Sequence, residues 1–196
     1  MDFNRATFVK PIDYTYFHKV IDTNFLEENI KFLKEKTPPK KDTGDTFLSE
    51  TGLQERLVWD LPLQDSTFFL LIETISELIQ KANDQYQFDL FNFISIHYME
   101  YSKGDTTPLD WHLDLANSFP FNVRKLSFSI LVNDPKEYKG GDLEIFKGKK
   151  NNFSTTIPKD PGGVVVFPSY LLHRVTPVTE GTRKVIVGFI GGRPFR

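Results

Sequence analysis

The chain has 196 residues, a formal net charge of -2 and no cysteine. Its hydrophobic content of 39% and its 19 phenylalanines are typical of a globular protein with an aromatic core, and they argue against disorder. Without cysteine, disulfides and thiolate ligands are excluded, so any bound metal must be held by imidazole and carboxylate groups. The near-neutral charge, with no basic patch, argues against a nucleic-acid partner.

The N-terminal stretch MDFNRATFVKPIDYTYF lacks the uninterrupted apolar run of a signal peptide. No segment of the sequence reaches the length of apolar residues that spans a bilayer. We therefore expect a cytoplasmic protein with no membrane partner. A chain of this length predicts one domain over residues 1–196, and the sequence does not indicate its oligomeric state.

Two segments of the first half have the apolar spacing of helices. In residues 23–36 apolar side chains recur at helical spacing, Asp22 or Thr23 is placed to cap the N-terminus, and lysines gather near the C-terminal end. Residues 65–82 carry a longer apolar stripe with a period of 3.6 residues, typical of a helix that packs on a sheet. Between them, DTGDTFLSET at residues 42–51 predicts a surface loop, either an inert connection or a lid.

From residue 88 onward the sequence changes to short β-like runs separated by turn residues. The absence of helical patterns between these runs favours an antiparallel sandwich or barrel over βαβ units. We predict a mainly β protein with packed helices: a double-stranded β-helix (jelly-roll, cupin-like) core at residues 88–192, with N-terminal helices from residues 1–87 on its major sheet. The β-like runs are FDLFNFISIHYMEY, RKLSFSILVN, GGDLEIF, FSTTI, GGVVVFPS and RKVIVGFIGG.

The stretch LDWHLDLANS, residues 109–118, places His112 and Asp114 two positions apart. With 4 histidines and 26 acidic residues, a shuffled chain would contain such a pair about as often as not, so the rest of the sequence must decide its meaning. On an extended strand both side chains project from one face, with Cα atoms roughly 6.5 Å apart, and both can reach one ion. His173, which follows the apolar run GGVVVFPSYLL, is the best candidate for a third ligand.

The other two histidines favour structural interpretations. His18 lies before the first helix in a segment without the character of a site, so we expect it at the surface or at a sheet edge. His97 lies in a run that is apolar on both faces, which predicts a hydrogen-bonded core histidine. Two histidines and one carboxylate on a β scaffold form the facial triad of non-haem Fe(II) oxygenases. Zinc with the same ligands, acting through an activated water, remains the competing interpretation.

Arg183 begins the apolar strand RKVIVGF, ten residues after His173. Strand alternation places Arg183, Val185 and Val187 on one side. An arginine that points into a barrel is costly unless a carboxylate meets it, and its planar fork suits the distal carboxylate of 2-oxoglutarate. The structural alternatives are an internal salt bridge and a solvent-facing strand end.

Three ordered motifs, HLD, RKLSFSILVNDPKEYKGGDLEIF and GGVVVFPSYLLHRVTPVTEGTRKVIVGF, resemble the prolyl 4-hydroxylase-like branch of the 2-oxoglutarate and Fe(II)-dependent dioxygenases, especially its bacterial and viral PKHD-type members. The resemblance covers residues 88–192. It implies that His112, Asp114 and His173 bind Fe(II) and that Arg183 pairs with the C5 carboxylate of 2-oxoglutarate.

The resemblance also implies further cosubstrate contacts. Tyr101 matches the tyrosine on the strand that enters the site, although a core aromatic residue is the structural alternative. Leu131 stands where some relatives carry a tyrosine that hydrogen-bonds 2-oxoglutarate, and a leucine cannot form that bond, so the second contact stays open. Leu143 and Val175 match apolar positions beside the cosubstrate and are equally compatible with a core. In LSFSILV the two serines and Leu131 share one face, which fits a pocket wall.

An enzyme of this kind would use Fe(II), 2-oxoglutarate and O2, with ascorbate as a supporting reductant, and would form succinate and CO2 while hydroxylating a C–H bond. Since Asp114 leaves no ligand position for chloride, hydroxylation is favoured over halogenation. The resemblance favours a prolyl residue in a peptide or protein, with residues 40–51 and 115–124 as closing lips. A free amino acid or small metabolite is the alternative substrate. A zinc hydrolase and a non-catalytic metal-binding jelly roll are the alternatives from other classes.

Overall fold

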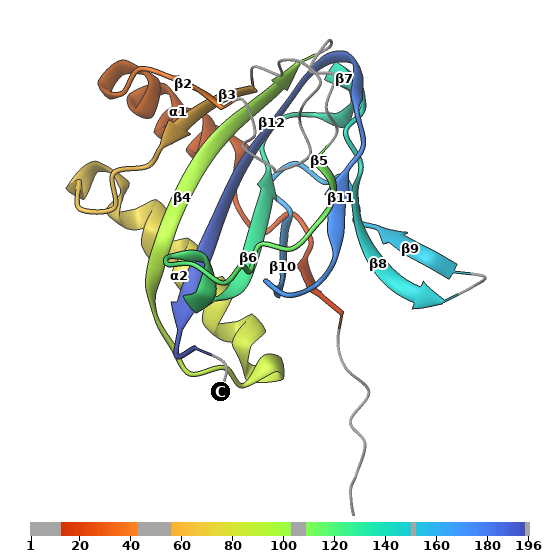
Figure 1. Ribbon diagram of the computed structural model, residues 1–196. Helices are drawn as coiled ribbons and strands as arrows, with labels where there is room; N and C mark the ends of the chain where they lie inside the picture. The colour runs from red at the N-terminus through yellow and green to blue at the C-terminus, as the bar shows by residue number, and fades with distance from the viewer. Residues whose placement is uncertain (1–12, 43–55, 103–108, 150–151, 195–196) are drawn as a thin grey trace, which may run out of the picture.

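Two antiparallel sheets and two main helices make up the fold (Figure 1), in a computed structural model that describes residues 13–42, 56–102, 109–149 and 152–194. Seven strands of the larger sheet follow the order β1-β10-β6-β12-β4-β3-β2, and β7 pairs with β12. The smaller sheet has the order β5-β11-β8-β9. These paired sheets with packed helices confirm the predicted jelly roll.

The elements are β1 (Thr15–Phe17), α1 (Thr23–Lys36), β2 (Lys40–Asp42), β3 (Arg56–Asp60), η2 (Ser66–Phe68), α2 (Phe69–Tyr86), β4 (Leu90–Ser102), β5 (Leu109–His112), η3 (Phe121–Val123), β6 (Arg124–Leu131), η4 (Pro135–Glu137), β7 (Tyr138–Gly140), β8 (Leu143–Lys149), β9 (Asn152–Thr156), β10 (Val164–Pro168), β11 (His173–Val175) and β12 (Val178–Gly192).

Both predicted helices are present, with one correction. Helix α1 has the predicted bounds, and the Asp22 side chain caps it by accepting a hydrogen bond from the Phe25 backbone N–H. The second helix starts as the short 3-10 turn η2 and then continues as α2 to Tyr86, four residues beyond the predicted end at residue 82. The prediction stopped too early because it ended the stripe at Ala82, whereas Tyr86, one turn later, still packs against the core. Gln87 ends α2 in the left-handed conformation, with φ of 57°.

The large sheet has two different faces. Residues of one parity on β12, such as Ile186 and Ile190, belong to a buried core with the apolar sides of α1 and α2. Residues of the other parity, such as Val185 and Val187, face the smaller sheet instead. The helices therefore cover one face of the large sheet (Figure 1). The second face and the smaller sheet enclose a cavity.

The N-terminal part also contributes strands to the large sheet, which the sequence did not predict. Strand β1 pairs with β10, and β2 and β3 extend the sheet beyond β4. With three to five residues each, β1, β2 and β3 are too short to show a clear alternation, so their pairing depends on a partner strand. Residues 43–51 of the predicted loop lie outside the described residues.

Among the described helices, none combines the length and the apolar character that a membrane crossing requires.

Candidate metal centre

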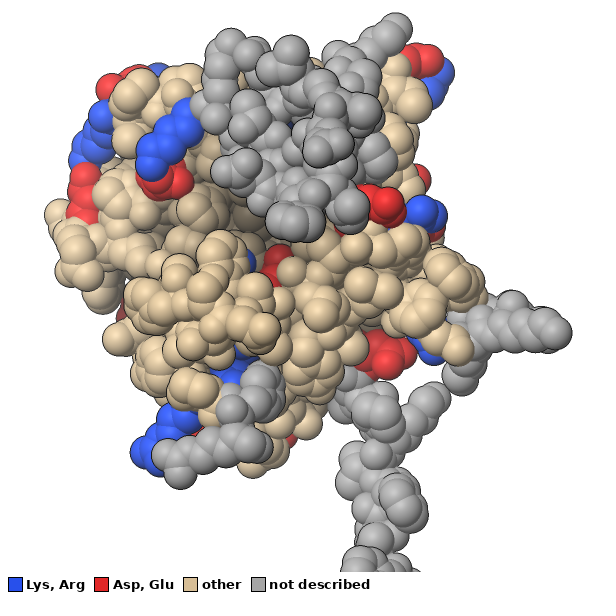
Figure 2. All heavy atoms as spheres, in the orientation of Figure 1, with Lys and Arg blue, Asp and Glu red and all other residues tan. Residues whose placement is uncertain are grey.

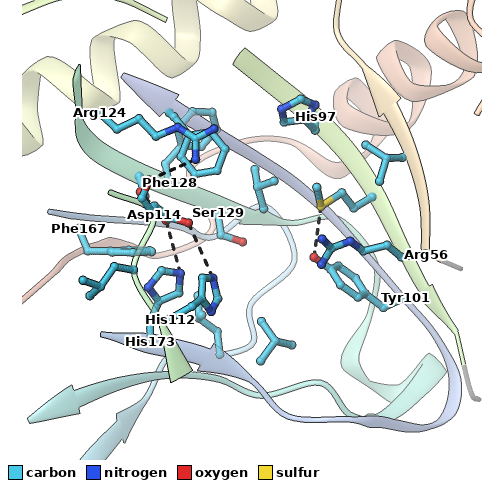
Figure 3. Close-up of a pocket in the computed structure, with 18 of the residues that line it drawn as sticks. Arg56, His97, Tyr101, His112, Asp114, Arg124, Phe128, Ser129, Phe167 and His173 are labelled. Atoms are coloured by element: carbon cyan, nitrogen blue, oxygen red, sulfur yellow. Dashed lines mark hydrogen bonds and ion pairs between the residues drawn. The ribbon is translucent and has the colours of Figure 1, made fainter. Parts of the chain in front are cut away.

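Three side chains that could bind one metal ion meet at the edge of the smaller sheet. His112 ends β5, His173 begins β11, and the two residues are direct partners in the antiparallel pair. Asp114 follows just after β5, and its backbone N–H donates to the Ser169 carbonyl at 3.0 Å. One ligand atom from each of the three side chains lies within 4.8 Å of the others. The predicted meeting of these residues is confirmed, and they point toward one another in Figure 3.

Each histidine is oriented by a backbone carbonyl. His112 donates its Nδ1 hydrogen to the Asp110 carbonyl at 2.7 Å, and His173 donates its Nδ1 hydrogen to the Leu171 carbonyl at 2.9 Å. A carbonyl only accepts, so the proton must reside on Nδ1, and the Nε2 lone pair of each ring is free for a metal. Both Nε2 atoms face Asp114, at 3.8 Å from Oδ1 for His112 and 3.4 Å from Oδ2 for His173. Since cis ligands about 2.1 Å from an ion lie about 3 Å apart, small side-chain movements would close this site on a metal.

The carboxylate of Asp114 is held by the large sheet. Ser127 on β6 donates to Asp114 Oδ2 at 2.7 Å, and the Ser127 hydroxyl shares a hydrogen bond of 2.9 Å with Ser169. Because Ser127 has one hydroxyl hydrogen and gives it to Asp114, Ser169 must be the donor in the second bond. This chain of hydroxyls leaves Asp114 Oδ1 free toward the metal position and fixes the rotation of the carboxylate.

His173 is the most buried of the three, with 5% of its surface exposed. Burial lowers the pKa of His173, while the nearby Asp114 carboxylate acts in the opposite direction. The ring of Phe167 packs edge-on against His173 with centroids 4.8 Å apart. Burial therefore favours the neutral imidazole, which is the form that binds metals.

The three residues lie in the wall of a cavity of about 560 Å³ between the two sheets. Four of the five positions that the resemblance assigns to the cosubstrate also line it, namely Tyr101, Leu143, Val175 and Arg183. The fifth, Leu131, does not line this cavity but a small hollow of about 20 Å³ next to it. In the view of Figure 2, charged side chains lie mainly around the edge of this side of the molecule.

Arg183 has an unusual environment for an arginine. Only 5% of its surface is exposed, and within the described ranges no carboxylate forms an ion pair with it. Its guanidinium carbon lies 5.6 Å from the ring centroid of Tyr101, whose backbone pairs with it across β12 and β4. An internal salt bridge, which was the structural alternative, is therefore not found in the described part of the chain. A buried cation in a cavity wall without a protein anion suits an anionic ligand.

His97 has the predicted hydrogen bonds but not the predicted place. Its Nδ1 donates to Asp60 Oδ1 at 2.8 Å, and its Nε2 lies 2.8 Å from the Ser95 hydroxyl. However, its side chain lines the cavity on the wall across from the triad (Figure 3), so it does not belong to the core. The prediction failed because the two faces of β4 differ: Ile96 and Tyr98 belong to the core with the helices, whereas His97 lines the cavity. His18 lies at the surface as predicted, with 67% of its side chain exposed.

Arg124 is a cavity residue that the sequence pattern missed. Its guanidinium carbon lies 3.6 Å from the ring centroid of Phe189 and 4.4 Å from that of Phe121, and it donates to the Asp114 carbonyl at 3.3 Å. As the first residue of β6 it resembled an ordinary charged strand end. Only the packing of two distant aromatic rings around it reveals its position in the wall.

Comparison with known proteins places these features in a family. The family model of the 2OG-Fe(II) oxygenase superfamily matches residues 96–191, which include all three triad residues and Arg183. A PKHD-type hydroxylase from Synechococcus sp. (strain CC9605) is 44% identical over 81 residues, or 41% of this chain and 35% of that protein. A PKHD-type hydroxylase from Synechococcus sp. (strain CC9902) is 32% identical over 126 residues, or 61% of this chain and 54% of that protein. The match thus spans between about a third and about half of the length of these relatives.

Solved structures share the fold at low sequence identity. A Pseudomonas putida prolyl-4-hydroxylase superposes with a TM-score of 0.68 at 17% identity, covering 92% of this chain and 93% of the other. A Trichoplax adhaerens prolyl hydroxylase, in complex with a peptide fragment of the hypoxia inducible factor oxygen degradation domain, superposes with a TM-score of 0.72 at 12% identity, covering 92% and 84%. These similarities confirm the fold class.

Proposed function

We propose that the chain is a member of the 2OG-Fe(II) oxygenase superfamily, and that it is a hydroxylase that binds Fe(II) through His112, Asp114 and His173. The donor set fits the metal, because two imidazoles and one carboxylate suit Fe(II) and leave further coordination positions open. Bound iron and 2-oxoglutarate together supply the chemistry, which converts 2-oxoglutarate and O2 into succinate and CO2 and hydroxylates a substrate C–H bond.

The observation that carries this proposal is the buried Arg183 in the same cavity as the triad. A metal-binding site alone is equally compatible with a zinc hydrolase. A zinc hydrolase has no need of a buried guanidinium, whereas the distal carboxylate of 2-oxoglutarate would neutralise it and accept its paired hydrogen bonds. We therefore assign Arg183 to this carboxylate, with Tyr101, Leu143 and Val175 as further walls of the cosubstrate site.

The protein groups around the triad have orienting roles in this proposal. The carbonyls of Asp110 and Leu171 keep the Nδ1 protons in place, so that both Nε2 atoms stay available to the metal. Ser127 prevents rotation of the Asp114 carboxylate. No side chain has to act as a general base, because the cofactor pair supplies the reaction and the protein supplies orientation.

For the substrate, we propose a prolyl residue in a peptide or protein. Support comes from apolar surface beside the metal: Leu113 and Phe121 line the cavity although 47% and 40% of their surfaces are exposed. Phe119, in the predicted lip of residues 115–124, is 78% exposed. Exposed apolar side chains at the mouth of a pocket suit an apolar ring such as that of proline. The Trichoplax relative was solved with a peptide, which agrees with this substrate class.

The test of the reaction class is an anaerobic visible-absorption titration of the metal-free protein with Fe(II) and then 2-oxoglutarate. We expect the weak charge-transfer band of an iron-bound keto acid only when both are present, and its loss in His112→Ala. Tight zinc binding with no such band in the Fe(II) titration would contradict the proposal and favour a hydrolase or a structural metal site.

The substrate class requires a separate screen. The iron-loaded protein with 2-oxoglutarate and O2 is incubated with proline-containing peptides and, in parallel, with free amino acids, and products are analysed by mass spectrometry. We expect a gain of one oxygen atom on peptides containing proline and none on matched peptides in which alanine replaces proline. Oxidation of free amino acids alone would overturn the peptide assignment and leave the reaction class intact.

A further inference from the structure

The hydroxyl of Tyr138 is an unexplained polar group near Arg183. Tyr138 begins β7 and is 4% exposed, and its hydroxyl hydrogen has no acceptor among the described residues, although Arg183 lies close enough to donate to the hydroxyl oxygen. Buried hydroxyls normally have a partner, because leaving one unpaired costs free energy. A native structure retains such a group when something absent from the protein chain completes the bond.

The position of Tyr138 indicates what that partner is. Its backbone pairs with Gly181 of β12, and its side chain enters the small hollow of about 20 Å³ that Arg183 also lines. Ser129, Leu143 and Arg183 line both this hollow and the main cavity, so the two spaces share a wall. A hollow of this size holds one small group, such as a carboxylate oxygen or a water.

Gly141 allows the two side chains to come together. A Cβ atom at Gly141 would stand 2.7 Å from Cδ of Arg183 and 3.5 Å from Cε2 of Tyr138. The absence of a side chain there leaves room for the stem of Arg183 beside the tyrosine ring. Burial raises the pKa of the Tyr138 hydroxyl, while Arg183 lowers it through its charge and through a hydrogen bond to the hydroxyl oxygen.

Two other tyrosines near the hollow already donate their hydroxyl hydrogens to protein groups. The Tyr101 hydroxyl donates to Met99 Sδ at 3.2 Å, and the Tyr16 hydroxyl donates to Asp160 Oδ2 at 2.8 Å. Lys159 donates to the Gly140 carbonyl and forms an ion pair with Asp142. Leu131 lines the hollow without any polar atom in its side chain. Tyr138 is therefore the tyrosine of this group whose hydroxyl is available to a ligand.

We propose that the Tyr138 hydroxyl donates a hydrogen bond to the distal carboxylate of 2-oxoglutarate, beside Arg183. This assignment rests on the proposed function and supplies the second cosubstrate contact that Leu131 cannot make. Arg183 and Tyr138 reach the same hollow from neighbouring strands, β12 and β7. Tyr138 is thus a binding residue that selects keto acids with a second carboxylate.

The test compares equilibrium binding of two keto acids to wild type and Tyr138→Phe. Both proteins are loaded with Fe(II) without oxygen and titrated with 2-oxoglutarate, and with 2-oxopentanoate, which lacks the distal carboxylate. We expect Tyr138→Phe to bind 2-oxoglutarate roughly tenfold or more weakly, the usual effect of removing a hydrogen bond to a charged group. Its affinity for 2-oxopentanoate should not change.

Tyr16→Phe is the matched control, because its hydroxyl is already bonded to Asp160 and its loss should not alter 2-oxoglutarate affinity. Equal 2-oxoglutarate affinity in wild type and Tyr138→Phe would overturn the assignment, as would an equal loss for both keto acids. Failure of the wild type itself to bind 2-oxoglutarate would instead refute the proposed function. Thermal melting of the metal-free proteins checks folding, and Tyr138→Met, which also lacks the hydroxyl, replaces Tyr138→Phe if that variant does not fold.

Discussion

The two ends of the cavity differ in whether the protein itself completes the hydrogen bonds of the groups that line them. At the metal end, the protein orients each ligand itself, through two backbone carbonyls and the Ser127 hydroxyl. At the other end, the described residues offer no ion-pair partner to Arg183 and no acceptor to the Tyr138 hydroxyl hydrogen. The first end is preorganised for a small ion, while the second is complete only with a ligand that carries its own anion.

This difference predicts that mutations at the two ends change the stability of the protein without metal or cosubstrate in different ways. Removing a partner at the metal end leaves a polar group without its bond, which costs free energy of unfolding and affinity together. Removing Arg183 breaks no ion pair within the described structure, and the Tyr138 hydroxyl hydrogen has no acceptor there. Ligand affinity should therefore fall there without a matching loss of stability.

The largest effect is expected from Asp114→Ala. This change removes the only carboxylate of the described triad, so we expect loss of Fe(II) binding and of all 2-oxoglutarate turnover down to background. Metal content after Fe(II) loading and succinate formation measure the two effects. Asp110→Asn is the control, because its carboxylate accepts from the Trp111 backbone N–H and not from the triad. Normal iron content in Asp114→Ala would contradict the assigned ligand set.

The next largest effect is expected from Arg183→Ala. Loss of one partner from a buried charge pair costs about 2–5 kcal/mol, so 2-oxoglutarate affinity should fall by at least about 30-fold. The melting temperature of the metal-free protein should stay the same or rise. Saturating 2-oxoglutarate should raise the melting temperature of iron-loaded wild type but not of this variant.

Arg174→Ala is the matched control for Arg183→Ala. Arg174 is partly exposed and paired with Glu144 at 2.6 Å, so its removal should leave 2-oxoglutarate affinity unchanged. Equal losses of affinity in the two arginine variants would remove the distinction between the two ends of the cavity.

A smaller effect is expected from Ser127→Ala, which sharpens the description of the metal end. Without the hydroxyl, the Asp114 carboxylate is free to rotate, and groups that orient metal ligands typically contribute about 10–100-fold to metal affinity. Calorimetric titration with Fe(II) or Mn(II) measures the change. Ser154→Ala on β9, away from the triad, should behave like wild type. Unchanged affinity in Ser127→Ala would show that the triad needs no support from β6.

The smallest effect concerns the wall that bears His97 and Asp60. Burial lowers the pKa of His97, against the opposing effect of Asp60, so the folded protein binds this proton less readily than the unfolded chain. Below pH of about 6.5 the unfolded state therefore binds more protons, and stability decreases as the pH falls toward the lowered pKa. His97→Gln should make the decrease in melting temperature on acidification shallower, whereas His18→Gln at the surface should not. The same pH profile in wild type and His97→Gln would contradict this prediction.

Much of the fold and the triad could be predicted because both depend on patterns within single segments. Apolar spacing identified α1 and the start of the second helix, and alternation placed Arg183 and Ser127 on the cavity face. The spacing of His112 and Asp114, with His173 after an apolar strand, was enough to predict that the three ligands meet, and the structure confirms it. Chemistry that requires adjacent residues of one strand is visible in the sequence itself.

The sequence by itself determined a jelly roll with a two-histidine, one-carboxylate site, because strand alternation and residue spacing are local properties. Tertiary structure decided which polar groups have partners. Pairing of β3 with β4 brought Asp60 to His97, and the packing of the two sheets placed this predicted core residue in a cavity wall. Pairing of β7 with β12 brought Tyr138 to Arg183, where no carboxylate of the described protein meets either side chain. Hydrogen bonding between distant strands depends on their register in space, and no single stretch of sequence encodes it.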